Sequence, residues 1–166
     1  CLYLSKPVVR QEPVLLPSPI ESGAPDNLAA NFYGTVLCDE GKFRMWYYAC
    51  HRGMNPDWPT RKKRQIAKKQ DWLLDAKQGT EFLQGPLCYA ESDDGLTWIK
   101  PTLNQLAFKG GRHNNAFDLP HTVVSGAAVI RDDTEPDPNR RYKMVYQFFP
   151  DQTDPVIEEY GTLPSM

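Results

Sequence analysis

Cysteine and histidine are the residue types whose spacing would show most directly what chemistry this chain can do. The chain has four cysteines and three histidines, namely Cys1, Cys38, Cys50, Cys88, His51, His113 and His121. Paired ligands of structural zinc sites are typically about two to five residues apart, and none of these residues has that spacing. We therefore predict neither a metal nor a cofactor. Cys38, Cys50 and Cys88 lie in apolar, strand-like contexts, which favours buried free thiols over disulfides.

The elements that would position any site are predicted to be β-hairpins. An Asp-Gly dipeptide between two apolar runs is among the strongest hairpin signals, and it predicts strands at Leu87–Glu91 and Thr97–Ile99. We expect Ser92 and Asp93 to accept hydrogen bonds from the backbone N–H groups of the turn. Trp98 should pack back over the turn. Because turn chemistry explains every residue here, we interpret this stretch as structural.

Two more hairpins are predicted along the chain. The first pairs residues 33–38 with residues 43–49, and the other pairs residues 123–130 with residues 141–149. In the first return strand, alternate side chains from Phe43 share one face and those between them share the other. Residues 123–130 form a nearly continuous apolar run, which is typical of a strand buried on both faces.

These two hairpins match each other and predict an internal repeat. Residues 34–38 align with residues 126–130 at an offset of 92, from Gly34 to Gly126. Residues 43–47 align with residues 142–146 at an offset of 99, from Phe43 to Tyr142. The return strands share the pattern aromatic, basic, Met, apolar, Tyr. Repeats at such intervals are typical of β-propellers, in which each blade is a four-stranded sheet.

Residues 53–84 interrupt the β pattern and are predicted to be an insertion with a helix at residues 60–77. The helix begins with a basic run at residues 61–64 and continues with Lys68 and Lys69. A nucleic-acid patch is one interpretation, but a solvated helix face is favoured because acidic residues follow. The net charge of −2 gives no general case for nucleic acid or anionic membrane. No apolar run reaches the roughly 20 residues that span a bilayer.

Four motifs resemble the amino-terminal blades of five-bladed β-propeller glycosidase-like proteins, the superfamily of invertases, levansucrases and arabinanases. The motifs are Gly-Lys-Phe-Arg-Met-Trp-Tyr, Cys-Tyr-Ala-Glu-Ser-Asp-Asp-Gly-Leu-Thr-Trp-Ile-Lys-Pro, Asn114-Asn115 and Arg-Arg-Tyr-Lys-Met-Val-Tyr. The Ser-x-Asp-Gly-x-Thr-Trp turn is one residue shorter than the Asp-box of sialidases and resembles it. The resemblance implies an all-β fold, a partial five-bladed propeller of about one and a half blades with one helical insertion.

The resemblance also implies an organisation for the whole chain as one propeller segment over residues 1–166. Its parts are an irregular lead-in at 1–30, a first blade at 31–101, the start of a second blade at 102–150, and a tail at 151–166. The remaining blades would come from the same longer chain or from other subunits. Relatives of this kind are often secreted or periplasmic, so the same compartments are expected here.

Glycoside hydrolysis uses one carboxylic acid to protonate the leaving oxygen and one carboxylate as nucleophile or base. The resemblance implies that such acids stand beside the innermost strands, which makes Asp26 and Asp118 the catalytic candidates. Asn31, His121 and Trp46 are candidates for binding the sugar. A capping or buried role for His121 and core packing for Trp46 remain alternatives.

Two functions therefore stay open. The first is a glycoside hydrolase-like propeller that acts on a polysaccharide or oligosaccharide by carboxylate acid/base chemistry. The second is a non-catalytic propeller module for carbohydrate binding or protein assembly, because neither Asp26 nor Asp118 lies in an Asn-Asp-Pro or Arg-Asp-Pro motif.

Overall fold

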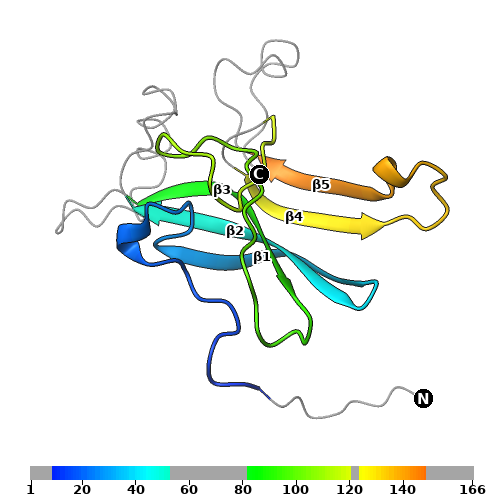
Figure 1. Cartoon of the computed structure of the whole chain (residues 1–166), viewed down its shortest axis with the longest axis horizontal. Helices are drawn as coiled ribbons and strands as arrows, with labels where there is room; N and C mark the ends of the chain where they lie inside the picture. The colour runs from blue at the N-terminus through cyan, green and yellow to red at the C-terminus, as the bar shows by residue number, and fades with distance from the viewer. Residues whose placement is uncertain (1–8, 53–81, 121–123, 149–166) are drawn as a thin grey trace, which may run out of the picture.

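The computed structural model describes residues 9–52, 82–120 and 124–148, and they form an all-β fold (Figure 1). This confirms the all-β part of the predicted fold class. The elements are η1 (Ile20–Ser22), β1 (Ala29–Asp39), β2 (Lys42–Arg52), β3 (Phe82–Ser92), β4 (Val124–Arg131), η3 (Pro138–Arg140) and β5 (Tyr142–Phe148). Both η elements are single turns of 3-10 helix.

The first sheet is an antiparallel meander in the order β1-β2-β3. The outer edge of β3 is paired along part of its length by two isolated bridges, Cys88 with Ala116 and Glu91 with Ile99. Reciprocal backbone hydrogen bonds of 2.9 Å join Glu91 and Ile99. The described loop segments therefore cover an edge that would otherwise expose unpaired backbone groups.

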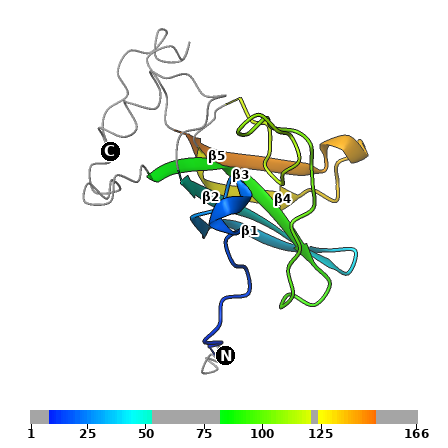
Figure 2. The ribbon, with the colours of Figure 1, turned by 60° about the vertical axis from the view of Figure 1, so that its left-hand side comes forward.

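The second sheet is the antiparallel hairpin β4-β5, and it stacks on the first sheet (Figures 1 and 2). Hydrogen bonds from Thr35 place β1 against β4. One core lies between the two sheets and contains Trp46, Leu87, Tyr89, Val124, Ala127 and Val129. The other lies on the opposite face of the first sheet and contains Met45, Tyr47, Ala49, Cys88, Ala90 and Ala116. The alternation predicted for β2 is confirmed, because neighbouring residues enter different cores.

A glycine stands at a register shift in each of the two neighbouring strands. Gly34 lies within the irregular part of β1, where a Cβ would collide with the carbonyl oxygen of Trp46. Gly126 lies at the shift in β4 and has φ +62°. Both positions require glycine, one for close backbone approach and one for its left-handed conformation.

Thr35 links the two sheets directly beside these bulges. Its Oγ1 donates to the carbonyl oxygen of Ala127 at 3.1 Å and accepts from the backbone N–H of Val129 at 3.0 Å. One hydroxyl therefore satisfies a donor and an acceptor of β4 that have no strand partner on that side.

With Met45 aligned to Met144, as in the predicted repeat, the strand pairing shifts the alignment of the two first strands by one residue. Val36 pairs with Met45 in the first sheet, and Val129 pairs with Met144 in the second. The offset is therefore 93 from Val36 to Val129 and 99 from Met45 to Met144. The predicted offset of 92 aligned the glycines, but the bulges contain different numbers of residues, so the register past them shifts by one.

The Asp-Gly turn forms as predicted, with one change of acceptor. Ser92 Oγ accepts from the backbone N–H groups of Asp94 and Gly95 at 3.3 and 2.9 Å. Asp94, and not Asp93, accepts hydrogen bonds from the backbone N–H groups of Leu96 and Thr97, at 2.7 and 2.6 Å. Trp98 packs back over the turn, and its Nε1 donates to the carbonyl oxygen of Gly95 at 3.0 Å. The expected strand at residues 97–99 is reduced to the Ile99 bridge.

These hydrogen bonds make the turn sensitive to acid. The amides of Thr97 and Leu96, followed by the Ser92 hydroxyl, lower the pKa of Asp94 from 3.8 to about 2. A lowered folded-state pKa stabilises the fold above the unfolded pKa, and this contribution is lost as pH falls through 2. We expect wild type to lose more stability than Asp94→Asn between pH 4 and 2, measured by urea unfolding. Asp93→Asn, in the same turn, should behave like wild type.

Other boundaries differ from the prediction. The strand β1 begins at Ala29, four residues before the expected strand start at residue 33, and β3 begins at Phe82, so the last three residues of the expected insertion pair with β2. The expected helix at residues 60–77 lies outside the described residues. Cys38, expected to be buried, is exposed, whereas Cys50 and Cys88 are buried free thiols as expected. Only one face of β4 is buried among the described residues.

Candidate functional site

Asp26, a predicted catalytic acid, lies at the centre of a polar cluster that is closed to solvent. Its side chain is 0% exposed. The hydroxyl of Tyr47 donates to its Oδ2 at 2.8 Å, and Nζ of Lys100 lies 2.5 Å from the same oxygen. The lead-in brings Asp26 to the face of the first sheet from which Tyr47 projects. Lys100 follows the Asp-Gly turn, so the cluster joins three separate parts of the chain.

Lys100 also binds the lead-in upstream of Asp26. Its Nζ donates to the carbonyl oxygen of Leu16 at 2.7 Å and contacts Ser18 Oγ at 3.1 Å. With the carboxylate, these acceptors fill all three donor positions of the ammonium group. Asp26 Oδ1, in contrast, is buried and has no hydrogen-bond partner among the described residues.

Asn115 completes the cluster from the side of β3. Its Nδ2 donates to the hydroxyl of Tyr47 at 2.8 Å and to the carbonyl oxygen of Tyr89 at 2.7 Å. Burial raises the pKa of Tyr47 far above its usual range, so its hydroxyl stays protonated. Burial likewise raises the pKa of the Cys88 thiol, which keeps this cysteine an unreactive part of the core.

The structure does not bring the predicted site residues together. Trp46 is 6% exposed and projects into the core between the sheets, on the face opposite Tyr47 and Asp26. Its ring lies 5.6 Å from that of Tyr89, an arrangement typical of aromatic core packing. Asn31 is half-buried and donates to Sγ of Cys50 at 3.2 Å. Asp118 is exposed on a loop, and His121 lies outside the described residues.

In this arrangement the Asp26 cluster ties segments together and does not present an acid to a substrate. A general acid or nucleophile must come within hydrogen-bond distance of the sugar, and an enclosed, ion-paired carboxylate is not placed to do so. Sequence reasoning did not identify Lys100 and Tyr47 as partners of Asp26. The partners are 74 and 21 residues away, and no local pattern indicates such a pairing.

A second polar cluster, also missed, joins the two sheets at the end of β1. Asp39 has a 4% exposed side chain and forms ion pairs with Arg131 at the end of β4 and with Arg44 on β2. The hydroxyl of Tyr142, at the start of β5, donates to the same carboxylate. Arg44 also donates from Nη1 to the hydroxyl of Tyr89 at 3.1 Å, and this hydrogen bond is the main cause that raises the pKa of Arg44.

Among the described residues, no group of three or more Cys, His, Asp or Glu side chains is placed to hold a metal ion. The same residues contain no helix with the length and apolar character needed to cross a lipid bilayer. Comparisons with protein-family models, with curated proteins and with solved structures give no match to this chain.

Proposed function

We propose that this chain forms successive sheets of a five-bladed β-propeller of the glycosidase-like kind, and that this propeller binds carbohydrate. The observation that carries the proposal is the stacking of a β1-β2-β3 meander, extended by bridges along β3, on a second hairpin of the same repeat. Repeated four-stranded sheets packed face to face are the organising feature of propellers. The proposal that the ligand is a carbohydrate is based on the resemblance of the four motifs to glycosidase-like propellers.

The role proposed for the described residues is non-catalytic. Asp26 is enclosed and ion-paired, and Asp118 is exposed on a loop. The described part of the chain would then form the wall of the propeller and position its sugar-binding loops.

Glycoside hydrolysis is the second candidate, and one observation favours it. Buried polar atoms without partners are uncommon in native structures, and a catalytic role is one accepted explanation for them. Asp26 Oδ1 is such an atom. In a hydrolase, Asp26 and Asp118 would be the acids to test first.

An oligosaccharide panel separates the two candidates. We expect the native full-length protein to bind at least one oligosaccharide saturably by calorimetry, and any release of reducing ends to survive Asp118→Asn. A general acid or base typically contributes about 100-fold or more to the rate, so a loss of that size in Asp118→Asn would establish hydrolysis through this acid. Asp26→Asn is informative only if its near-UV circular dichroism matches wild type. Failure to bind any sugar would contradict both candidates.

A further inference from the structure

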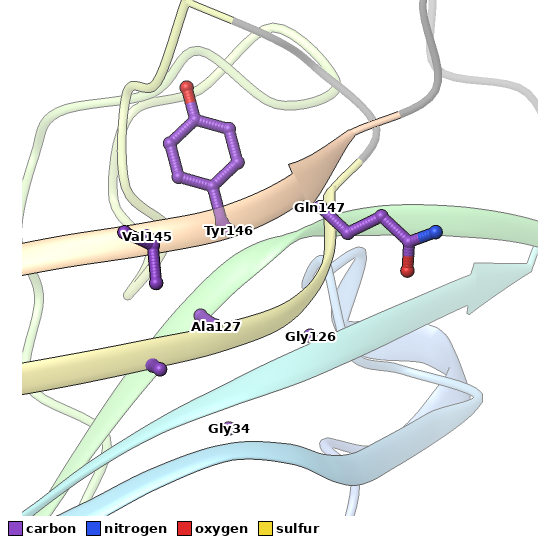
Figure 3. Close-up of a pocket in the computed structure, with 7 residues that line it drawn as sticks. Gly34, Gly126, Ala127, Val145, Tyr146 and Gln147 are labelled. Atoms are coloured by element: carbon purple, nitrogen blue, oxygen red, sulfur yellow. The ribbon is translucent and has the colours of Figure 1, made fainter.

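A surface hollow that carries reactive groups lies beside the Asp-Gly turn. It measures about 380 Å³, and its lining includes Ser92, Asp94 and Thr97. The hollow of about 590 Å³ at the glycine bulges, in contrast, is lined by described residues that have no carboxylate, amine or thiol (Figure 3). Asp94 is exposed, so water reaches its carboxyl group.

The sequence contains one Asp-Gly pair, Asp94-Gly95, and no Asn-Gly pair. In an open chain such a pair isomerises, because glycine has no Cβ that hinders the approach of its backbone nitrogen to the preceding carboxyl carbon. The nitrogen of Gly95 attacks Cγ of the neutral acid, and its proton leaves with one carboxyl oxygen as water, which gives a cyclic imide. Water then opens the imide at the main-chain carbonyl carbon of Asp94. The product is isoaspartate, in which the main chain runs through Cγ.

The turn requires both members of this pair. Gly95 has φ +71°, a left-handed conformation that other residues adopt only at a cost. Oδ1 of Asp94 accepts from the backbone N–H groups of Leu96 and Thr97. The residues that build the turn are therefore also the residues that isomerise readily in an open chain.

The folded turn restrains the attacking nitrogen. The N–H group of Gly95 donates to Ser92 Oγ at 2.9 Å, and the carbonyl oxygen of the same glycine accepts from Nε1 of Trp98 at 3.0 Å. The ring of Phe43 lies against Gly95, since a Cβ added there would be 3.6 Å from it. Gly95 is thus fixed at its nitrogen, at its carbonyl group and on one face.

The turn also restrains the carboxyl group that would be attacked. Oδ1 of Asp94 accepts from Ser92 Oγ at 2.9 Å, and Oδ2 accepts from Thr97 Oγ1 at 3.1 Å. The amides of Thr97 and Leu96, followed by the Ser92 hydroxyl, lower the pKa of Asp94 to about 2. Because an oxygen leaves as water only from the neutral acid, this stabilisation of the carboxylate makes the reactive form scarce at neutral pH.

We propose that Asp94-Gly95 is a site of isoaspartate formation that the folded turn keeps closed, and that Ser92 is the residue that restrains the Gly95 nitrogen. Isomerisation then starts only from states in which the turn has opened, so its rate follows the population of those states. Isoaspartate adds a methylene group to the main chain and moves the carboxylate away from the amides of Leu96 and Thr97. The original turn cannot form again, so each event marks a molecule whose turn has opened.

Peptide mapping of the full-length protein during incubation at pH 7 tests this proposal. Isoaspartate at position 94 is quantified by electron-transfer fragmentation, because isomerisation leaves the mass unchanged. We expect the native protein to form it at least about 10-fold more slowly than the same protein unfolded in guanidinium chloride. Ser92→Ala should accelerate the reaction in the folded protein about 5-fold or more. Thr97→Val, the matched control, removes a hydroxyl but keeps the amide, and should change the rate less than about 2-fold.

Equal rates in the native and the unfolded protein would overturn the proposal. A folded Ser92→Ala variant that isomerises at the wild-type rate would overturn the role of Ser92. Hydrogen exchange at the Gly95 amide of wild type needs no variant and covers the case in which Ser92→Ala does not fold. The proposal requires this amide to be protected, and exchange at the rate of an open chain would contradict it. The inference concerns the turn alone, so it does not depend on carbohydrate binding.

Discussion

Replacing Asp39 by Asn is expected to lower the free energy of unfolding by about 3 kcal/mol. The variant keeps the shape of the side chain but removes the charge that faces two guanidinium groups. Arg131 and Arg44 are each 29% exposed, so water solvates them only partly once the carboxylate is gone. Urea unfolding should show a lower midpoint with an unchanged slope.

Asp133→Asn is the matched control, because it removes a different partner of the same arginine. Asp133 Oδ1 lies 2.8 Å from Nε of Arg131, but its side chain is 74% exposed. Exposed ion pairs contribute little, so this variant should change stability by less than about 1 kcal/mol. If the two variants lost equal stability, the burial of Asp39 would not explain the destabilisation.

The Asp39 cluster also joins the two hairpins, which adds a consequence for their packing. It connects the ends of β1 and β4 with the start of β5. Loss of this connection should reduce amide protection in β4 and β5 more than in β3, as seen by hydrogen exchange. A uniform loss would indicate that the sheets unfold as one unit.

The hairpins could be predicted because their determinants are local. Alternation in β2 and the Asp-Gly turn are both visible within a few residues, and both are confirmed. Asp93 and Asp94 show the limit of this reasoning. Both side chains can accept hydrogen bonds from the backbone N–H groups of the turn, and only the geometry of the formed turn selects Asp94.

The polar clusters could not be predicted, because their members come together only when the sheets pack. Tyr142 and Asp39 are 103 residues apart, and no spacing rule links them. The partners of Asp26 in the candidate site could not be predicted for the same reason. The prediction placed Asp26 and Trp46 near one site, but Asp26 contacts Tyr47, which leaves β2 on the face opposite Trp46. Proximity in sequence to an inner strand does not determine the face on which a residue lies.

The second large effect is expected from Lys100→Met, which should lower the free energy of unfolding by about 3 to 4 kcal/mol. Methionine retains the length of the side chain but leaves the enclosed Asp26 carboxylate with the Tyr47 hydroxyl as its only remaining donor among the described residues. It also releases the lead-in at Leu16 and Ser18. Thermal or urea unfolding at pH 7 measures the loss.

A double variant distinguishes a buried charge from lost packing. Asp26→Asn/Lys100→Met removes both charges and should be more stable at pH 7 than Lys100→Met alone, because no unpaired carboxylate is then left in the enclosed cluster. The absence of any recovery in the double variant would mean that Lys100 acts through its aliphatic stem.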